Sequence, residues 1–364
     1  MIRILQIIDH MGSGGIQAFI MNVYRNIDRN QIQFDFLLHH RYDHAYYKEV
    51  EQLGGHIYYV PPRSEGILKN RKALNNFFDS HPEYQIVHMH ESSLSYITPL
   101  QVASEYGVRK RIIHSHSSNI AGNQLHRALH WWHKKSVHKV ATHYLACGEL
   151  AAKWMYGGSK VEDNAKVVYN GIDIKSYEFN TSMRKSVRDE FGIPDNAIVI
   201  GHVGRFDDVK NHHYLVDILA AMKEIHDKSY LMLIGNGPRF EGTKHYAKEL
   251  NVENNVLFLG IRGDVSRLLQ GVDVFVLPSF YEGFPVVAIE AQSSGLPVLM
   301  SDTISDEVII KENVEQMSIQ LPAEKWAKRI VELSSQRITD NDVLYKNGFD
   351  VSCTVKILSD LYLS

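Results

Sequence analysis

Short runs of apolar residues alternate with longer amphipathic segments along almost the whole chain. Apolar runs bounded by turn residues are typical of strands that are buried on both faces of a sheet. Because these runs alternate with helical patterns, the sequence predicts βαβ units and parallel sheets. The predicted strands are residues 3–8, 34–39, 57–60, 86–90, 111–116 and 144–147 in the first half, and residues 197–203, 231–234, 256–259, 272–277 and 298–300 in the second.

Amphipathic helices are predicted after the first strand and at the end of the chain. In both segments the apolar residues recur at intervals of three and four, which is the spacing of one helical face. The first helix would bury Ile16, Phe19, Ile20, Val23, Tyr24 and Ile27, and the last, from residue 351, would bury Val355, Ile357, Leu358, Leu361 and Tyr362.

A polar segment separates the two series of strands. The 364 residues are many for one hydrophobic core and sufficient for two domains. Residues 170–173 (Asn-Gly-Ile-Asp) are a turn signal, and the charged stretch 175–190 follows. We therefore predict one domain over 1–175 and a second over 176–345. The helix over 346–364 is expected to pack back on the first domain.

Composition narrows the classes of function. The formal net charge of -3 argues against a dedicated nucleic-acid binder, which would be basic. Cys147 and Cys353 lack metal-ligand spacing and suit a reducing compartment. The first residues lack the features of a signal peptide, and no apolar run approaches the ~20 residues of a membrane span. We expect a cytoplasmic protein that can touch the cytoplasmic face of the membrane.

Two carboxylates, Glu282 and Glu290, follow the predicted strand 272–277. Glu282 lies in a loop that ends at Pro285, and Glu290 lies in the helix that this proline starts. In an open α/β sheet, ligands bind at the carboxyl ends of strands, and a helix N-terminus favours anions such as a diphosphate. Even as one helix, the eight residues would separate the acids by ~12 Å. A hydrolase pair needs roughly 5–9.5 Å, so we interpret both acids as ligand-binding groups.

Basic residues follow the predicted strand 197–203. Arg205 and Lys210 lie on the loop between this strand and the next helix. A guanidinium fork and an ammonium charge together suit a diphosphate and need no metal ion. A lone basic residue would be interpreted as a solvated loop residue, but Gly204 and Arg205 at a strand end, with the two glutamates, make that alternative weaker. Gly235 and Gly237 end the following strand, where glycine allows close approach of the backbone to a ligand.

The order of these motifs resembles a known family. G-R-x-x-x-x-K-N at 204–211, G-x-G-P at 235–238 and E-x7-E at 282–290 are similar to the donor-binding domain of family 4 retaining glycosyltransferases, which have the GT-B fold. Segments 301–304 and 324–326 resemble a bacterial subgroup that builds capsular polysaccharide and exopolysaccharide. The resemblance implies two Rossmann-like parallel-sheet domains that face each other across a cleft, the first on the acceptor side.

The resemblance also implies roles for individual residues. Arg205 and Lys210 would bind the nucleotide diphosphate and stabilise its charge as it leaves. Glu290 would accept hydrogen bonds from the ribose hydroxyls, with an exposed helix residue as the alternative. Glu282 would contact the donor sugar. The backbone between the two acids would line the sugar and phosphate pocket, through Gly283, Phe284, Pro285 (which has no N–H to offer) and Val286.

A glycine-rich loop follows the first predicted strand. Gly14 and Gly15 open the next helix, but Gln17 stands where a dinucleotide-binding motif needs its third glycine. Asp35, the candidate ribose-binding acid, lies early in its strand instead of at its end. Both observations argue against NAD. The resemblance implies that this loop faces the donor phosphate, with Gly15 allowing close approach.

Histidines end two strands of the first domain. The family carries a histidine at the end of strand 111–116 that contacts the donor sugar; His116 fits this position best, and His114 is second. The alternative of a capping or loop histidine has about equal weight. His88 and His90 would line the acceptor pocket. A metal site at these His-x-His pairs is disfavoured, and we interpret Asp340 and Asp342 as loop residues.

Residues 109–139 carry seven Lys or Arg residues, no acid, and the pair Trp131 and Trp132. A basic amphipathic helix of this kind can lie on an anionic membrane. The alternative of comparable weight is a solvated helix whose tryptophans pack inward.

The resulting prediction is a retaining, metal-independent hexosyltransferase without a resident cofactor. It would move a sugar from a nucleoside diphosphate, most simply UDP, to a glycan or a lipid-linked glycan. A GT-B UDP-sugar epimerase is one alternative, but the sequence offers no convincing acidic pair at the strand ends of the first domain. A catalytically silent GT-B partner protein is another, although Arg205, Lys210 and both glutamates are present.

Overall fold

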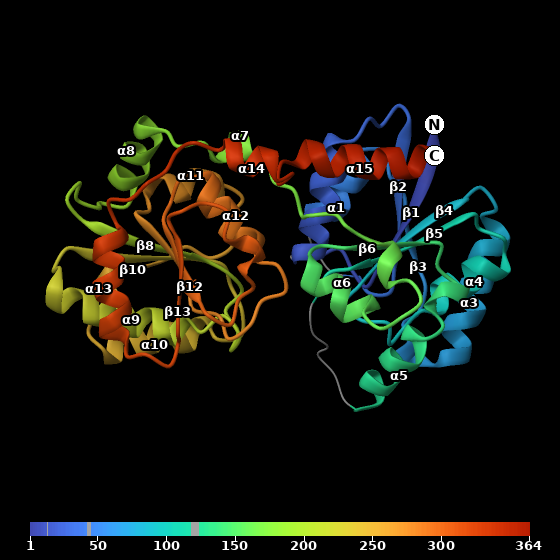
Figure 1. Ribbon diagram of the computed structural model, residues 1–364, viewed down its shortest axis with the longest axis horizontal. Helices are drawn as coiled ribbons and strands as arrows, with labels where there is room; N and C mark the ends of the chain where they lie inside the picture. The colour runs from blue at the N-terminus through green and yellow to red at the C-terminus, as the bar shows by residue number, and fades with distance from the viewer. Residues whose placement is uncertain (13, 42–44, 118–123) are drawn as a thin grey trace. The chain divides into compact units, whose positions relative to one another are not determined.

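The computed structural model describes residues 1–12, 14–41, 45–117 and 124–364. The chain forms two compact units, one of residues 1–171 with 350–364 and one of residues 172–349. Each unit is built on its own parallel sheet (Figure 1). The chain passes between the units at 171/172 and 349/350. The boundaries predicted from the sequence, at 175/176 and 345/346, lie close to these points.

The first unit contains a seven-stranded sheet in the order β3-β2-β1-β4-β5-β6-β7. All pairings are parallel, with Leu5 opposite Val87 where β1 meets β4 and His90 opposite His114 where β4 meets β5. The strands are β1 (Ile2–Ile8), β2 (Ile32–Leu38), β3 (Ile57–Tyr59), β4 (Ile86–Glu91), β5 (Lys110–Ser115), β6 (His143–Ala146) and β7 (Ala165–Val167).

The helices of the first unit include the two that the apolar pattern predicts at the chain ends. Helix α1 buries Phe19, Ile20 and Val23 against the sheet, as their spacing predicts. The helices are α1 (Gly15–Asn26), α2 (Ala45–Gln52), α3 (Ile67–Ser80), α4 (Thr98–Glu105), α5 (Gln124–Lys134), α6 (Glu149–Tyr156) and α15 (Val351–Leu363), with short 3₁₀ helices η1 (Arg63–Glu65), η2 (Val137–Lys139) and η3 (Glu162–Asn164).

Helix α15, at the end of the chain, packs beside α1 in the first unit (Figure 1). Leu358 and Tyr362 enter the core of this unit. The Lys110 ammonium donates to the carbonyl of Leu361 at 2.8 Å, which holds the last turn of the helix. Ile357, expected on the apolar stripe, is instead 42% exposed, because the buried face is narrower than the pattern predicts.

The second unit contains a six-stranded parallel sheet in the order β10-β9-β8-β11-β12-β13. Its strands are β8 (Ile198–Val203), β9 (Ser229–Ile234), β10 (Val256–Phe258), β11 (Val274–Leu277), β12 (Val298–Ser301) and β13 (Val314–Met317). The apolar pattern of the sequence does not predict β13 here or β7 in the first unit. Both are short strands at a sheet edge and carry polar residues, so neither forms a continuous apolar run.

The helices of the second unit cover a core in which Trp326 and Phe206 are fully buried. Helix α12 lies against β11 and β12, and it buries the polar residues Gln292 and Ser293 together with its apolar ones. The helices are α7 (Ile174–Tyr177), α8 (Thr181–Glu190), α9 (His212–Ile225), α10 (Phe240–Glu249), α11 (Val265–Leu268), α12 (Val286–Ser293), α13 (Ala323–Leu333) and α14 (Asp342–Lys346), with 3₁₀ helices η4 (Glu253–Asn255), η5 (Leu269–Gly271) and η6 (Asp306–Val308).

Each sheet has one point at which the strand order reverses. In the first unit this point lies between β1 and β4, and in the second between β8 and β11. Loops leave such neighbouring strands in opposite directions, which opens a crevice at their carboxyl ends, and ligands of open α/β sheets bind there. Strand order therefore directs attention to the residues that follow β1, β4, β8 and β11.

Asp35, in the middle of β2, is held by hydrogen bonds within the first unit. Its carboxylate is fully buried and accepts from Arg3 at 2.5 Å, from the Tyr84 hydroxyl at 2.7 Å and from the backbone N–H of His56 at 2.7 Å. Burial opposes ionisation of this carboxyl, but the three donors outweigh it and hold its pKa below the ordinary value. The residue is occupied within the sheet, in agreement with the argument against a ribose-binding role.

Replacement of Asp35 by asparagine should destabilise the first unit. The change removes the counter-charge of Arg3, whose side chain is only partly buried, and weakens the contacts of the buried carboxylate, so it should cost about 1–3 kcal/mol. Denaturation followed by tryptophan fluorescence measures the effect, since Trp131, Trp132 and Trp154 all belong to this unit. Asp79→Asn, at an exposed residue of α3, is the matched control. Equal unfolding midpoints for the two variants would contradict this account of Asp35.

Candidate functional site

The loops that follow β8 and β11 are joined by an ion pair. The Lys210 ammonium lies 2.6 Å from Oε1 of Glu282, and both side chains are largely buried, with 18% and 13% exposed. The structure therefore brings together two residues that the sequence places 72 positions apart. A Cβ on Gly204 would lie 3.3 Å from the Lys210 side chain, so glycine at this position leaves room for the lysine stem.

Backbone contacts hold the same two loops together. The N–H of Phe280 donates to the carbonyl of Val209 at 2.9 Å, and the side-chain amide of Asn211 donates to the carbonyl of Pro278 at 3.2 Å. Asn211 has a φ of 56°, a left-handed conformation that asparagine tolerates better than most residues. The Lys210–Glu282 pair is thus carried by loops whose backbones are already linked.

The two glycines after β9 pack against the loop after β8. Gly235 has a φ of 136°, and a Cβ there would lie 2.0 Å from the carbonyl oxygen of Gly204. A Cβ on Gly237 would lie 2.5 Å from the carbonyl oxygen of Phe206. Glycine is therefore required by contact between the two loops, a reason that the sequence analysis, which invoked only approach to a ligand, did not foresee.

Arg205 differs from Lys210 in its surroundings. Its side chain is exposed, and within the described ranges its guanidinium has no hydrogen-bond or ion-pair partner. In the free protein, the ion pair with Glu282 neutralises the charge of Lys210. The charge of Arg205 has no such partner among the described residues. A guanidinium in this position can form two parallel hydrogen bonds to a phosphate.

Glu290 lies on α12, one turn before the helix ends at Ser293. Burial raises the pKa of its carboxyl to about 7, and a hydrogen bond from Tyr177 of α7 opposes that rise. Tyr177 is a residue that the sequence analysis missed, because only folding brings α7 against α12. The exposed-residue alternative for Glu290 is wrong, since the carboxyl is partly buried and held by a partner.

The N-terminus of α12 follows directly on the loop of Glu282. Pro285 is the residue that precedes the helix, and no side chain caps the first N–H groups. Val286, at the start of the helix, therefore has its N–H available, and the helix dipole favours an anion there. Phe284 stacks on Phe349 with ring centroids 6.0 Å apart, and Gly283 separates it from Glu282.

In the first unit, Gly14 and Gly15 open α1. Gly14 precedes the helix in an extended conformation and provides no side-chain cap. A Cβ on Gly15 would meet no atom within 4 Å in the described part of the chain. Packing within the protein therefore does not explain glycine at this position, and the first N–H groups of α1 are open to a ligand. Ser13, between Gly12 and Gly14, lies outside the described residues.

The end of β5 separates the two candidate histidines. His114 lies inside the strand with no exposed surface, whereas His116 follows the strand and is partly exposed. This placement favours His116 as the histidine that can reach a ligand. His88 and His90 are 0% and 3% exposed within β4, so the expectation that they line an acceptor pocket is wrong. Side chains on that face of β4 point into the unit and not toward solvent.

Two acids at adjacent strand ends of the first unit escaped the sequence analysis. Asp9 follows β1 and Glu91 ends β4, and these strands are neighbours at the point where the strand order reverses. Burial, together with the negative charge of Asp9, raises the pKa of Glu91 to about 8. Each acid directly follows an apolar run, a signal visible in the sequence, but the strand order that pairs them is not. The expectation of no acidic pair at these strand ends is therefore wrong.

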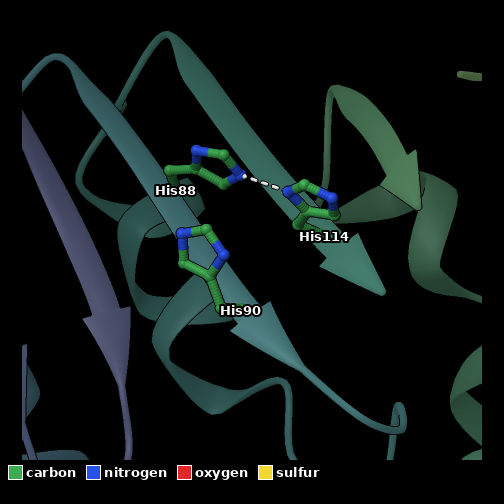
Figure 2. Close-up of side chains that lie close together, drawn as sticks. All are labelled: His88, His90 and His114. Carbon is green, nitrogen blue, oxygen red and sulfur yellow. Dashed lines mark hydrogen bonds between the residues drawn. The ribbon is translucent and has the colours of Figure 1, made fainter. Parts of the chain in front are cut away.

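Metal-ligating residues gather at one place in the described part of the chain. His88, His90 and His114 have ring nitrogens within 4.8 Å of one another (Figure 2). Asp340 lies in the loop before α14, as the sequence predicts, whereas Asp342 is the first residue of that helix, so the loop interpretation is wrong for Asp342. The Asp342 N–H donates to the Asp340 carboxylate. The orientation of the three histidine rings decides whether they can share a metal ion.

The basic segment 109–139 exposes its tryptophans on α5. Trp131 and Trp132 are 55% and 74% exposed, and Leu125 is 65% exposed, so the alternative of an inward-packed tryptophan pair is wrong. Trp131 and Trp132 line a hollow together with Lys135 and Lys139. Residues 118–123 of this segment lie outside the described residues. Within the described ranges, no helix is both long enough and apolar enough to cross a membrane.

Two family models together match nearly the whole chain. The model described as Glycosyltransferase Family 4 matches residues 13–176, and the model described as Glycosyl transferases group 1 matches residues 183–350. The first match falls on the first unit and the second on the second unit, which carries the Lys210–Glu282 pair.

Similar proteins support the same grouping. A Bacillus subtilis (strain 168) protein named as a glycosyltransferase, EpsF, is 33% identical over 99% of this chain and 96% of its own length. The UDP-Gal:alpha-D-GlcNAc-diphosphoundecaprenol alpha-1,3-galactosyltransferase of Escherichia coli is 26% identical over 84% of this chain and 83% of its own. The capsular polysaccharide biosynthesis glycosyltransferase CapH of Staphylococcus aureus is 25% identical over 100% and 99%.

A solved structure with a similar fold is that of Anabaena Alr3699/HepE in complex with UDP. It superposes with a TM-score of 0.80 at 19% sequence identity and covers 100% of this chain and 99% of that chain. At this identity the likeness concerns the fold, which is the GT-B architecture of two Rossmann-like parallel-sheet domains that the sequence predicts.

Replacement of Glu290 by glutamine should stabilise the protein increasingly as pH rises. The folded-state pKa of about 7 is above the ordinary value of 4.5, so the native state binds this proton more tightly than the unfolded chain. The stability that the protonated carboxyl contributes is present below pH 4.5 and lost as pH rises through 7. The gain for Glu290→Gln should therefore grow over this window, to roughly 3 kcal/mol at most.

Melting temperatures of both proteins between pH 4.5 and 8 measure this gain. Glu224→Gln, at an exposed residue of α9, is the matched control and should show a constant difference from the wild type. If Glu290→Gln also shows a constant difference, the carboxyl titrates at its ordinary pKa and the account of its surroundings is wrong.

Proposed function

The chain belongs to the glycosyltransferase family described by the group 1 and family 4 models, and we propose that it moves a sugar from a nucleoside diphosphate, most simply UDP, to a hydroxyl of a glycan or a lipid-linked glycan in polysaccharide biosynthesis. The observation that carries this proposal is the position of Lys210, Glu282 and the N-terminus of α12 at the point where the strand order of the second sheet reverses. UDP in the HepE structure, and the UDP-galactose donor and lipid-linked acceptor in the name of the Escherichia coli relative, support the choice of substrates.

The diphosphate is assigned to the positive groups of the second unit. Arg205 offers a free guanidinium fork, Lys210 an ammonium, and α12 the N–H groups of its first turn. The helix holds the N–H groups of α12 in place, and the two cations lie on neighbouring loops, so together they can stabilise the negative charge that grows on the leaving diphosphate. Because they supply this charge themselves, we assign the enzyme no resident metal ion and no cofactor.

The two glutamates hold the two ends of the donor. Glu290 is assigned to the ribose hydroxyls, at a place where α7, which carries Tyr177, packs against α12. Glu282 is assigned to the hydroxyls of the transferred sugar, next to Lys210. The backbone of Gly283, Phe284, Pro285 and Val286 lies between them, and the glycine contacts at Gly204, Gly235 and Gly237 shape the neighbouring loops.

Retention of the anomeric configuration is part of the proposal. Glu282 is an unsuitable nucleophile because its carboxylate is paired with Lys210, which withdraws its charge. The leaving phosphate can itself take the proton of the acceptor hydroxyl while positive character develops on the sugar. In the first unit, Gly14, Gly15 and His116 are assigned to the donor, and Asp9 and Glu91 to acceptor hydroxyls.

A UDP-sugar epimerase is the second candidate, because Asp9 and Glu91 provide the acidic pair that such an enzyme would need. The two activities are separated by one experiment. The protein is incubated with a UDP-sugar alone in deuterated water, and the recovered sugar is analysed by NMR. An epimer or a deuterium at the epimerised carbon supports the second candidate, and unchanged or hydrolysed donor supports the transferase.

The exposed face of α5 is assigned to an anionic membrane surface. Trp131 and Trp132 place amphipathic rings in solvent, and Lys135 and Lys139 line the same hollow. Tryptophan with neighbouring lysine suits the boundary between headgroups and acyl chains, where anionic lipids attract the cations. This face would keep a cytoplasmic enzyme at the cytoplasmic surface of the membrane, close to a lipid-linked acceptor.

Removal of either cation should abolish efficient transfer. A panel of nucleotides and nucleotide sugars is first screened by thermal shift, since a ligand of the folded state raises its stability. With the most stabilising donor, Arg205→Ala and Lys210→Ala should lower kcat/KM about 100-fold or more, as loss of one charge-stabilising donor does in other enzymes. Lys185→Ala, at an exposed lysine of α8, should retain wild-type turnover. Near-normal rates in both site variants would refute the assignment of the diphosphate.

Binding to membranes should depend on the tryptophan pair. Trp131→Ser with Trp132→Ser should reduce sedimentation with vesicles of phosphatidylethanolamine and phosphatidylglycerol about tenfold or more, because two large apolar side chains no longer leave water. Binding by the wild type should also weaken with salt. The control Leu68→Ser changes another exposed apolar residue of the first unit, which is 83% exposed. Equal sedimentation of all three proteins would contradict the membrane assignment.

A further inference from the structure

Four histidines lie together at the carboxyl ends of β4 and β5. The histidine cluster consists of His88 and His90 from β4, and His114 and His116 from the end of β5. In a strand, residues two apart share a face, so both pairs face the same side of the sheet. Phe19 of α1 covers them, with ring centroids 6.0, 5.1 and 5.3 Å from those of His90, His114 and His116.

Two separate hydrogen-bonded chains run through this cluster. In the first, Oε1 of Gln6 lies 2.8 Å from Nε2 of His90, and Nδ1 of His90 lies 2.9 Å from Nε2 of His116. Nδ1 of His116, at the end of this chain, is buried and has no partner among the described residues.

The second chain begins at the C-terminal helix. The Tyr362 hydroxyl lies 2.6 Å from Nδ1 of His88, and Nε2 of His88 lies 3.3 Å from Nδ1 of His114. Figure 2 shows this last contact as the dashed line between the two rings, with His90 beside them. The second chain therefore ends inside β5, whereas the first ends at the partly exposed His116.

The Gln6 amide presents its carbonyl oxygen to His90, since Oε1 of Gln6 lies 2.8 Å from Nε2 of that ring. The amide nitrogen of Gln6 is buried and has no hydrogen-bond partner among the described residues. Gln6 therefore enters the first chain through an atom that can only accept a hydrogen bond.

This orientation decides which nitrogen of each ring carries the proton. Burial lowers the pKa of all four imidazoles, that of His116 to about 3, so each ring is neutral and has one N–H and one lone pair. A carbonyl oxygen only accepts, so His90 carries its proton on Nε2 and accepts at Nδ1. The atom that donates to it is Nε2 of His116. His116 therefore has an unprotonated Nδ1.

A metal site is the competing explanation for the cluster, and the ring geometry disfavours it. His88 and His90 are stacked, with centroids 4.1 Å apart and planes 28° apart. Imidazole binds metals through lone pairs in the ring plane, and the in-plane lone pairs of stacked rings do not converge on one point. Both nitrogens of His90 and both of His88 already have partners within the protein.

We propose that Gln6 and His90 are positioning residues that hold His116 in the tautomer with an unprotonated Nδ1, so that this atom accepts a hydrogen bond from a hydroxyl of the transferred sugar. The assignment of His116 to the sugar rests on the proposed function, whereas its tautomer rests on the first chain alone. A lone pair fixed in this way selects for a hydroxyl. A fluorine or a carboxylate at the same position cannot donate to it and would leave the buried lone pair unsatisfied.

The tautomer is measured without any substrate. The full-length protein is labelled with ring-¹⁵N histidine, and two-bond ¹H–¹⁵N spectra report which nitrogen of each ring is protonated. His116 is assigned by its loss in His116→Gln. The wild type should show a protonated Nε2 and an unprotonated Nδ1. Gln6→Met, which removes the carbonyl acceptor at similar volume, should move the proton of His116 toward Nδ1.

His88→Asn is the matched control. It interrupts the second chain at the same depth and should leave the spectrum of His116 unchanged. A protonated Nδ1 of His116 in the wild type would overturn the proposal, whatever the variants do. One equivalent of Zn²⁺ that shifts His88, His90 and His114 together would also overturn it, because the cluster would then be a metal site.

Turnover measurements test whether Gln6 positions His116 for the donor or only supports the fold. The donor is whichever of UDP-glucose, UDP-galactose and their N-acetyl forms is used fastest, together with its deoxyfluoro analogues. Gln6→Met should lower kcat/KM for the parent sugar about tenfold and should reduce the preference for hydroxyl over fluorine at one position. His88→Asn should retain that preference. An unchanged preference in Gln6→Met would overturn the proposal. The predicted tautomer in a protein that uses no donor would instead refute the proposed function.

Discussion

The ion pair between Lys210 and Glu282 is the interaction on which the second unit's site depends. It connects the loops after β8 and β11, the two strands between which the order of the sheet reverses. Those loops would otherwise diverge, since each runs to a helix on an opposite face. The pair, with the backbone contacts of Phe280 and Asn211, holds the N-terminus of α12 beside the β8 loop. Arg205 then remains the one site cation in the described structure whose charge is not already compensated.

The first unit is governed by a different constraint, which is the need of buried polar atoms for partners. A parallel sheet covered on both faces ordinarily buries apolar residues, yet β1 and β4 carry Gln6, His88 and His90 in the interior. The side chain of Tyr362 brings α15 into the same network. Most polar atoms of this interior are matched, but Nε2 of Gln6, Nε2 of His114 and Nδ1 of His116 have no partner among the described residues. In the first chain, the contacts that are made restrict His90 and His116 to one tautomer each. The hydrogen bonds that stabilise the fold therefore also determine which ring nitrogen of His116 carries the proton.

Much of this architecture is predictable from sequence because parallel strands and their helices have distinct apolar periods. Strands such as β1 and β11 were found from continuous apolar runs, and α1 from the spacing of Phe19 and Ile20. Strands β7 and β13 were not, because an edge strand of three or four residues buries too little to form a pattern. The motifs around Arg205, Lys210 and Glu282 are likewise visible, since each lies on one short loop.

The pairings within the site are not predictable in the same way, because they depend on strand order. Nothing in the chain shows that β1 and β4 are neighbours, so Asp9 and Glu91 stay two isolated acids until the sheet is known. The same holds for Tyr177 and Glu290, which meet only when α7 packs on α12. The exposure of the tryptophan pair is a third feature that the sequence does not determine. The composition of α5 fits either a buried or an exposed tryptophan pair, and the choice is made by His130, which occupies the inward position by stacking on Trp154.

Because the strand order brings Lys210 and Glu282 together, the pair can select a ligand in a way that neither residue could alone. In the free protein each side chain satisfies the other, so neither charge is left buried and unpaired. In the donor complex proposed above, a diphosphate takes the place of the carboxylate at Lys210, and a sugar hydroxyl takes the place of the ammonium at Glu282. A ligand with only one of these groups would separate the pair and leave one partner unsatisfied. A diphosphate joined to a sugar replaces both contacts at once, so the pair favours the intact donor over either of its fragments.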